Sequence, residues 1–147
     1  MFKSILVPID IAHRSSWQFA LPQAIELARA GGGALTVMTV VRDVKAMLEG
    51  VHLGYQLEMM VTDAKGRLAE IVASHRAEGQ AMEEVVRLGS IGHEILDAAR
   101  ECGADLIVMA SHRPEMRDYL IGPNAAHVAQ HASCSVLVLR RFEPSPA

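Results

Sequence analysis

Three segments of the chain carry side chains that could together hold a small, negatively charged ligand with an apolar part. Asp10 follows a short apolar run and supplies a carboxylate suited to a pair of ribose hydroxyls. Val40 lies near the end of a second run, where an apolar side chain and backbone groups suit the face and edge of adenine. A third segment, 110–122, carries Arg113 and leads through Gly122 into a predicted helix. Because a helix N-terminus offers free N–H groups and a favourable dipole, this segment suits phosphate.

Each of these features also has a purely structural interpretation. Asp10 could cap or brace the turn before the first helix. Gly122 could be a tight turn into the following helix, for which Pro123 is a natural first residue. Arg113 and Arg117 could be solvated loop charges. The three segments therefore indicate a nucleotide site as a set, provided that the fold brings them together.

Two other constellations are weaker. Ser111 and His112 invite a nucleophile–base interpretation, but sequence neighbours rarely present their side chains to each other, and no third group is fixed by spacing. His127 and His131 are four residues apart on a predicted helix, which is compatible with a metal ion, yet no third ligand accompanies them. We therefore predict neither a catalytic residue nor a metal site.

Short apolar runs alternate with helix-length amphipathic segments along the chain. The runs are rich in aliphatic and β-branched residues, as buried strands are. The amphipathic segments repeat apolar residues every three or four positions, which is typical of helices packed on one face. We predict strands over 5–7, 35–41, 82–88, 106–109 and 135–139, and helices from Ser15–Ser16 to 28, over 57–76, 91–99 and 123–131.

Two stretches give mixed signals. Ser15 and Ser16 are good N-caps for the first helix, whereas Pro22 lies inside the same pattern, so the helix is either kinked or starts later. Between residues 42 and 56, Gly50 and Gly54 mark a loop or a frayed helix.

The strict alternation of strands and helices predicts a three-layer αβα fold with a five-stranded, parallel, doubly wound, Rossmann-like sheet. Residues 1–141 form one predicted domain, followed by a C-terminal tail over 142–147. If the first strand is central, with the second and fourth as neighbours, the winding reverses beside it. Ligands of such sheets bind beyond the carboxyl ends of the strands at that reversal. The three segments with suitable chemistry would then share one cleft.

Composition excludes several other functions. The 147 residues carry a net charge of -3 and only 4% aromatic side chains, whereas nucleic-acid binders need a basic surface and, for single strands, stacking rings. No stretch approaches the roughly 18 apolar residues of a membrane span. Cys102 and Cys134 are far apart and no secretory leader is recognised. We therefore expect a cytoplasmic protein with two core thiols, without nucleic acid or membrane as partners.

Several motifs together resemble the universal stress protein family. Ile-Leu-Val-Pro-Ile-Asp (5–10) is similar to the family's first strand, and Gly-Ser followed by Glu-Ile-Leu (89–96) to the start of its third helix. The likeness spans about residues 1–141 and is specific only as a combination. It is completed by Ala-Ser-His-Arg-Pro (110–114), Tyr-Leu-Ile-Gly-Pro-Asn-Ala-Ala (119–126) and His-Ala-Ser-Cys-Ser-Val-Leu-Val-Leu-Arg (131–140).

The resemblance implies an adenine nucleotide alpha hydrolase-like fold, a homodimer formed through the last strand or a tetramer, and a cleft that in many members binds ATP. The implied ligand here is ATP, ADP or AMP, with Mg²⁺ as an accompanying ion. Asp10 would meet the ribose, and Val40 and Met109 the adenine. The other implied site residues line the pocket or follow the fourth strand, namely Pro8, Ile9, Ala110, His112, Arg113, Gly122, Pro123, Asn124 and Ala125.

The chain departs from the signature of the ATP-binding members, which is Gly-x-x-Gly, nine residues, then Gly-Ser or Gly-Thr. Ala110 and Arg113 replace the first two glycines, eight residues then precede Gly122, and Pro123 replaces the Ser or Thr. A subgroup with Ala-Ser-His-Arg-Pro followed by Gly-Ser-Asn is more similar and is associated with ATP binding. Pro123 removes a hydroxyl and an N–H, and each hydrogen bond to a charged group is worth roughly 1.5–3 kcal/mol. We therefore expect adenine nucleotide binding with a weaker preference for the triphosphate.

Two main functional hypotheses result, and a true enzyme such as a nucleotidyl transferase or phosphatase is a third, weaker one. The first is a regulatory stress-response module that binds adenine nucleotide, with at most slow ATP hydrolysis and no dedicated enzyme activity. The second is a nucleotide-independent dimeric interaction or scaffold protein of the same fold, whose cleft is disabled by Pro123. A protein partner is expected in either case.

Overall fold

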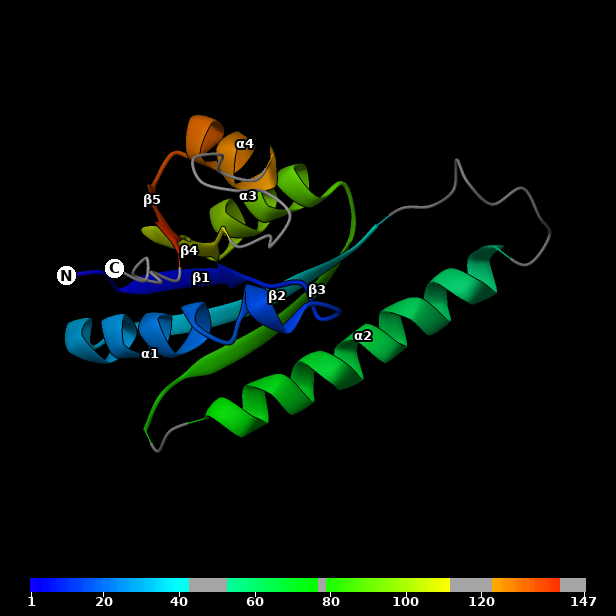
Figure 1. The fold of residues 1–147 in the computed structure, drawn as a ribbon, viewed down its shortest axis with the longest axis horizontal. Coiled ribbons are helices and arrows are strands. Elements are labelled where there is room, and N and C mark those ends of the chain that lie inside the picture. The colour runs from blue at the N-terminus through cyan, green and yellow to red at the C-terminus, as the bar shows by residue number, and fades with distance from the viewer. Residues whose placement is uncertain (43–52, 77–78, 112–122, 141–147) are drawn as a thin grey trace, which may run out of the picture.

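The computed structural model describes residues 1–42, 53–76, 79–111 and 123–140, and all statements below concern these residues (Figure 1). Strands and helices alternate as predicted. In chain order they are β1 (Ser4–Pro8), a short 3₁₀ turn η1 (Arg14–Ser16), α1 (Ala20–Gly31), β2 (Ala34–Arg42), α2 (Leu53–His75), β3 (Met82–Gly89), α3 (Ile91–Glu101), β4 (Leu106–Ala110), α4 (Pro123–His131) and β5 (Ser135–Leu139).

The five strands form one parallel sheet in the order β3-β2-β1-β4-β5. This confirms that β1 is central and that β2 and β4 are its neighbours. Helices α1 and α2 pack on one face of the sheet, and α3 and α4 pack on the other (Figure 1). The predicted three-layer, doubly wound fold is therefore confirmed.

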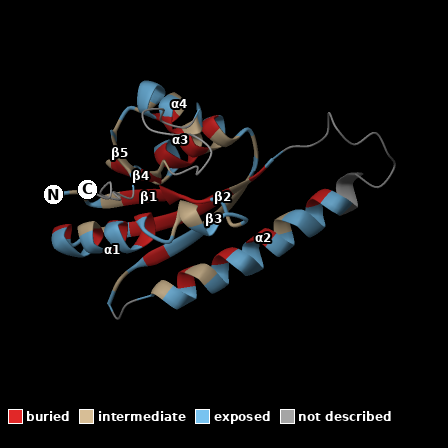
Figure 2. Ribbon diagram, viewed as in Figure 1, coloured by how far each residue is buried: buried red, intermediate tan, exposed pale blue. Residues whose placement is uncertain are grey.

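Burial on both faces explains the predominantly apolar sequences of the central strands. Side chains alternate between the two layers of core: Ile5 and Val7 pack with α1 and α2, whereas Leu6 packs with α3 and α4. The central strands are buried throughout most of their length (Figure 2). In contrast, the four apolar residues of edge strand β5 are only half-buried, and Leu88 of the other edge strand is 40% exposed.

A single carboxylate joins β1 to β4 at the amino end of the sheet. Asp105 accepts hydrogen bonds from the backbone N–H groups of Lys3 (2.8 Å) and Ser4 (3.1 Å). The hydrogen bond from Lys3 is the main cause of the lowered pKa of Asp105, whereas burial acts to raise this pKa. The two strands are thus held together at the end opposite the predicted cleft.

The first helix starts later than its serines, as the position of Pro22 suggested. Ser15 and Ser16 lie in η1, and α1 begins at Ala20 without a capping side chain. Pro22 is the third residue of α1, in the first turn, where the missing N–H has no helical partner to lose. The prediction of an N-cap at Ser15 or Ser16 is wrong because Ser16 bonds to the preceding loop instead.

The start of a second helix also differs from the sequence prediction. Helix α2 begins at Leu53 rather than 57, so Gly54 lies in its first turn; Gly50 lies outside the described residues. Helix α3 begins at Ile91 as predicted, and Ser90 occupies its N-cap position without making a side-chain capping bond.

The two cysteines are free and half-buried at the margin of the α3–α4 core layer. Burial raises the pKa of the Cys134 thiol, which is the behaviour of a packed thiol rather than a reactive one. Across the described ranges, no helix has the length and apolar character needed to cross a bilayer.

Candidate functional site

The candidate site lies where the two central strands β1 and β4 separate. Their pairing is limited to Ile5 with Leu106 and Leu6 with Ile107, although β1 continues to Pro8 and β4 to Ala110. The pairing of β1 with β2 continues further along the strand, since Pro8 still pairs with Met38 of β2. The sheet therefore opens only at the carboxyl ends of β1 and β4. This is the point at which the winding reverses, where open α/β sheets bind their ligands.

The chain beyond β1 is first held against β2. The N–H of Ile9 donates to the carbonyl of Met38 at 2.8 Å, and the buried hydroxyl of Thr39 donates to the carbonyl of Ile9 at 2.9 Å. Both bonds extend the β1–β2 contact by one residue. They fix the direction of the chain immediately before Asp10.

Asp10 is the centre of a hydrogen-bonded loop. Its carboxylate accepts the N–H of Ala12 at 3.0 Å on one oxygen, and the other oxygen lies 2.8 Å from Nδ1 of His13. The Ser16 hydroxyl accepts the N–H of Asp10 and lies within hydrogen-bond distance of the carbonyls of Asp10 and His13. The bracing role considered for Asp10 is therefore present.

The same carboxylate is still accessible to a ligand. The Asp10 side chain is 58% exposed, and an ionised carboxylate can accept about four hydrogen bonds, of which the loop uses two. The loop thus holds the carboxylate in place while leaving lone pairs for hydroxyl donors.

Val40 and Met109 lie on the same side of the sheet. Met109 is buried in the core layer formed with α3 and α4, and half-buried Val40 packs against that layer. Pro8 is buried, and the Ile9 side chain packs in the opposite layer with α1 and α2. Any contribution of Ile9 to a site beside Val40 therefore comes from its backbone.

Next to Val40, Arg87 of β3 is its register partner and points into the same layer. Its guanidinium donates to Glu94 at 2.9 Å and to Glu101 at 2.6 Å, both on α3. These contacts, led by the hydrogen bond to Glu94, raise the pKa of Arg87. The cation therefore fastens α3 to the sheet edge and is neutralised locally.

The predicted phosphate side is described only in part. His112, Arg113 and Gly122, as well as Arg117, lie outside the described residues. Pro123 is the exposed first residue of α4, Asn124 is half-buried, and Ala125 is buried against the α3–α4 core layer. The N–H groups of Asn124 and Ala125 lie in the first turn, where an α-helix provides no internal acceptor.

On the other side of the gap, β4 continues toward the same region. Ala110 packs half-buried against the α1–α2 layer, and the N–H of Ser111 donates to the carbonyl of Leu139 at 2.9 Å. The β4–β5 ladder is thus extended past the end of β4. This places the start of segment 110–122 beside the opening of the sheet.

Three residues make contacts in the site region that were not predicted from the sequence. Thr39 could have been found, because a hydroxyl inside a buried apolar run needs a hydrogen-bond partner. The sequence predicts Ser16 as a helix cap, whereas its hydroxyl bonds to the backbone of Asp10. Arg67 of α2 donates from Nη2 to the carbonyl of Ile11 at 3.1 Å, and nothing in the local sequence indicates this contact.

The histidines of α3 and α4 form a cluster without a metal-binding arrangement. The ring centroids of His93 and His127 are 5.4 Å apart, and those of His127 and His131 are 4.5 Å apart. Within the described segments, no three His, Cys, Asp or Glu side chains are placed to hold a metal ion. Gly92 makes the packing possible, since a Cβ there would meet the His127 ring at 2.5 Å.

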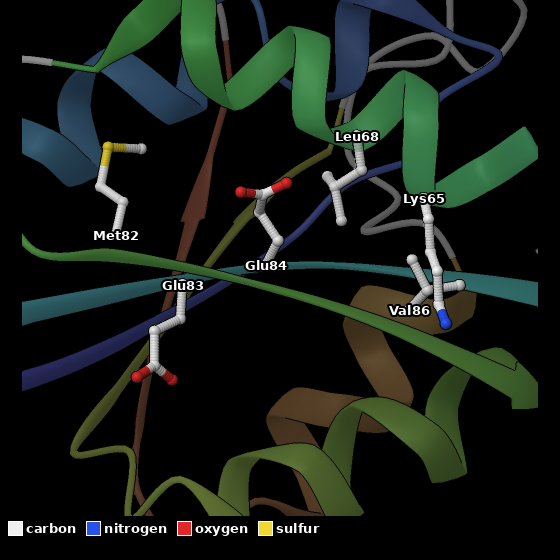
Figure 3. Close-up of a pocket in the computed structure, with 6 residues that line it drawn as sticks. All are labelled: Lys65, Leu68, Met82, Glu83, Glu84 and Val86. Carbon is white, nitrogen blue, oxygen red and sulfur yellow. The ribbon is translucent and has the colours of Figure 1, made fainter. Parts of the chain in front are cut away.

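A separate open hollow of about 520 Å³ lies between α2 and β3 (Figure 3). Glu84 points toward α2, and Glu83 points away from it (Figure 3). Glu84 is paired with Arg76 at 3.8 Å, and buried Leu68 forms part of the lining. The hollow lies at edge strand β3, and β2 separates this strand from the opening between β1 and β4. It is therefore not the candidate site.

A parallel sheet that opens beside a fixed, exposed carboxylate at its winding reversal places the chain among the open, doubly wound α/β proteins, whose ligands bind at this switch point. The universal stress protein family model matches residues 1–140. The chain belongs to the universal stress protein family.

Individual relatives agree with this assignment. Universal stress protein G of Shigella flexneri is 29% identical over 151 residues, covering 95% of this chain and 100% of the relative. The universal stress protein UspA of Lactobacillus plantarum superposes with a TM-score of 0.75 at 25% identity, covering 94% of this chain and 97% of that chain. A universal stress protein of Archaeoglobus fulgidus in complex with dAMP superposes with a TM-score of 0.68 at 23% identity, covering 92% of this chain and 96% of that chain.

Proposed function

We propose that this protein is a regulatory stress-response module that binds an adenine nucleotide (ATP, ADP or AMP), with at most slow ATP hydrolysis. The observation that carries the proposal is the separation of β1 and β4 beyond Leu6 and Ile107, directly beside the exposed carboxylate of Asp10. An opening at the winding reversal supplies the space, and the carboxylate supplies acceptors for a sugar.

Each part of the nucleotide has a chemically suitable group in this proposal. Asp10 accepts hydrogen bonds from the ribose hydroxyls, and Val40 with Met109 provides the apolar wall for adenine. The α4 N-terminus, with the N–H groups of Asn124 and Ala125, attracts the phosphates, and Mg²⁺ accompanies a bound triphosphate. The remaining members of the proposed set are Pro8, Ile9, Ala110, His112, Arg113, Gly122 and Pro123.

The dAMP-bound neighbour from Archaeoglobus fulgidus supports the ligand class in a limited way. At 23% identity the likeness concerns the fold, and it indicates that a sheet of this kind can accommodate an adenine mononucleotide. Pro123 at the first position of α4 has neither a hydroxyl nor an N–H to offer a phosphate. We therefore propose a smaller preference for ATP over AMP than a Ser or Thr at this position would give.

The wider setting belongs to the same proposal. Residues 1–141 act as one domain with a tail over 142–147, and two copies associate through β5, with a tetramer as the larger alternative. The module works in the cytoplasm, where bound nucleotide changes its affinity for a protein partner. ATP turnover is slow in this proposal because no residue of the site acts as a general base. Charge and positioning alone act on the phosphates.

The proposal is tested by nucleotide binding to the purified protein and to Asp10→Ala. We expect ATP, ADP and AMP to raise the melting temperature of the wild type, and calorimetry to show weaker binding to Asp10→Ala. AMP and 2′,3′-dideoxy-AMP should differ in affinity for the wild type and much less for Asp10→Ala, because only the former ligand can use the carboxylate. Asp63→Ala, which removes an exposed carboxylate from α2, is the matched control and should bind AMP like the wild type.

Absence of any response of the wild type to millimolar ATP, ADP or AMP would overturn the proposal. It would favour the alternative that Pro123 supports, a dimeric interaction or scaffold protein of the same fold that works without nucleotide.

A further inference from the structure

A contact between α2 and the loop after β1 connects two distant parts of the chain. Nη2 of Arg67 donates a hydrogen bond of 3.1 Å to the carbonyl of Ile11, 56 residues earlier. No carboxylate pairs with Arg67 in the portion of the chain that the structure describes. The guanidinium is therefore directed to a backbone carbonyl one residue beyond Asp10.

Besides the bonds of the Asp10 carboxylate itself and the backbone bond of Ile9 to Met38, three side chains hold the loop around Asp10. Thr39 of β2 holds the carbonyl of Ile9, and Ser16 closes the loop on itself through the backbone of Asp10. Arg67 is the third of these side chains and, among the described contacts of this loop, the one that comes from α2. The half-buried Ile11 side chain packs against the α1–α2 core layer below this attachment.

We propose that Arg67 is a positioning residue for the nucleotide site, which holds the Ile11 carbonyl so that the loop presents the Asp10 carboxylate to the ribose. This inference rests on the proposed function. It assigns to α2 a part in ligand binding, although the side chain does not itself contact the ligand. A charged donor suits this task because its hydrogen bond to a carbonyl is stronger than that of a neutral donor.

The arrangement has a reciprocal consequence. If holding the loop favours nucleotide binding, then bound nucleotide must favour the Arg67–Ile11 contact to the same extent. Nucleotide binding should therefore slow hydrogen exchange in the middle of α2. This gives a readout that is independent of affinity.

The test compares Arg67→Ala with Arg67→Lys and with Arg76→Ala. Arg76 is a matched control because it is another exposed arginine next to α2, and it pairs with Glu84 of β3 instead of the loop. We expect Arg67→Ala to weaken adenosine, AMP and ATP by the same factor, about three- to tenfold, since the ribose is common to all three. Arg67→Lys should restore part of the affinity, and Arg76→Ala should leave it unchanged.

Two further measurements separate positioning from a general loss of structure. In the Asp10→Ala background, Arg67→Ala should have no additional effect on AMP affinity, because the group that it positions is gone. AMP should slow hydrogen exchange of α2 amides in the wild type but not in Arg67→Ala, with both proteins folded by circular dichroism.

The inference is overturned if Arg67→Ala binds AMP like the wild type, or if its effect adds fully to that of Asp10→Ala. Failure of the proposed function looks different, because the wild type itself would then bind no adenine nucleotide.

Discussion

The carboxylate of Asp10 accepts bonds from Ala12 and His13 and remains 58% exposed. The loop bonds limit the conformations of the side chain before any ligand arrives, so little conformational entropy is lost when a ligand binds. A braced carboxylate of this kind is better prepared for two neighbouring hydroxyls than a freely rotating one. The structural and the ligand-binding interpretations of Asp10 are thus compatible.

Pro123 is the residue at which phosphate affinity can be tested most directly. Pro123→Ser adds a hydroxyl and an N–H to the first position of α4, and Pro123→Ala adds the N–H alone. Each new hydrogen bond to a phosphate is worth roughly 1.5–3 kcal/mol. We expect Pro123→Ser to tighten ATP by at least about tenfold and AMP by less, with Pro123→Ala between the wild type and the serine variant. Calorimetric titration of the three proteins measures this, and equal effects on ATP and AMP would contradict the phosphate assignment.

At the scale of elements, the strands were predictable because they are buried on both faces. Residues 106–109 are a continuous apolar run and 35–41 are apolar apart from Thr36 and Thr39, and a run that is buried on both sides needs no alternation of polar side chains. Helix starts were less predictable, because a serine can bond to several nearby backbone groups. Ser16 bonds to the Asp10 loop, and this partner is available only because the end of β1 places the loop next to Ser16.

The residues of the candidate site likewise include some that the sequence predicted and some that it did not. Asp10 was predictable because it directly follows a strand whose position in the sheet could be inferred from the alternation of elements. The face on which Ile9 packs and the contact of Arg67 were not predictable, because each depends on how α1 and α2 lie on the sheet. A contact over 56 residues leaves no local signal in one sequence.

Two of the helical glycines have opposite surroundings, which gives a prediction about packing. Gly31 is buried at the end of α1, where an added Cβ would overlap the carbonyl oxygen of Phe2. Gly66 is exposed within α2, and apart from its chain neighbours and the backbone of its own helix no atom lies within 4 Å of an added Cβ. We expect Gly31→Ala to destabilise the protein by about 1–3 kcal/mol through overpacking against backbone. Gly66→Ala should stabilise it by about 0.5–1 kcal/mol, because alanine favours the helix.

Thermal and urea unfolding of the two variants and the wild type measure both effects. A stabilising Gly31→Ala would mean that the N-terminal strand does not lie against the end of α1 as described. A destabilising Gly66→Ala would mean that the outer face of α2 is covered in solution.

At the scale of the whole molecule, the two edges of the sheet differ in character. The edge strand β3 carries the charged residues Glu83, Glu84 and Arg87, and charges on an edge oppose pairing with another strand. The edge strand β5 has an uninterrupted apolar sequence, Val136 to Leu139, in which each side chain is half-buried. A second copy related by a two-fold axis would cover both the free backbone edge and these side chains. The proposed association through β5 therefore has a physical reason in the unequal edges.

This leads to a prediction about the oligomer. The wild type should sediment as a dimer, or as a tetramer built from dimers, at micromolar concentration. Leu137→Glu should shift it toward the monomer, because a dimer through β5 would have to bury the new carboxylate without a partner. Leu88→Glu introduces the same charge on β3, at a side chain that is already 40% exposed, and should leave the oligomer unchanged. Circular dichroism checks that both variants are folded. Equal sedimentation of the two variants and the wild type would exclude β5 as the interface, whereas dissociation by Leu88→Glu alone would assign it to β3.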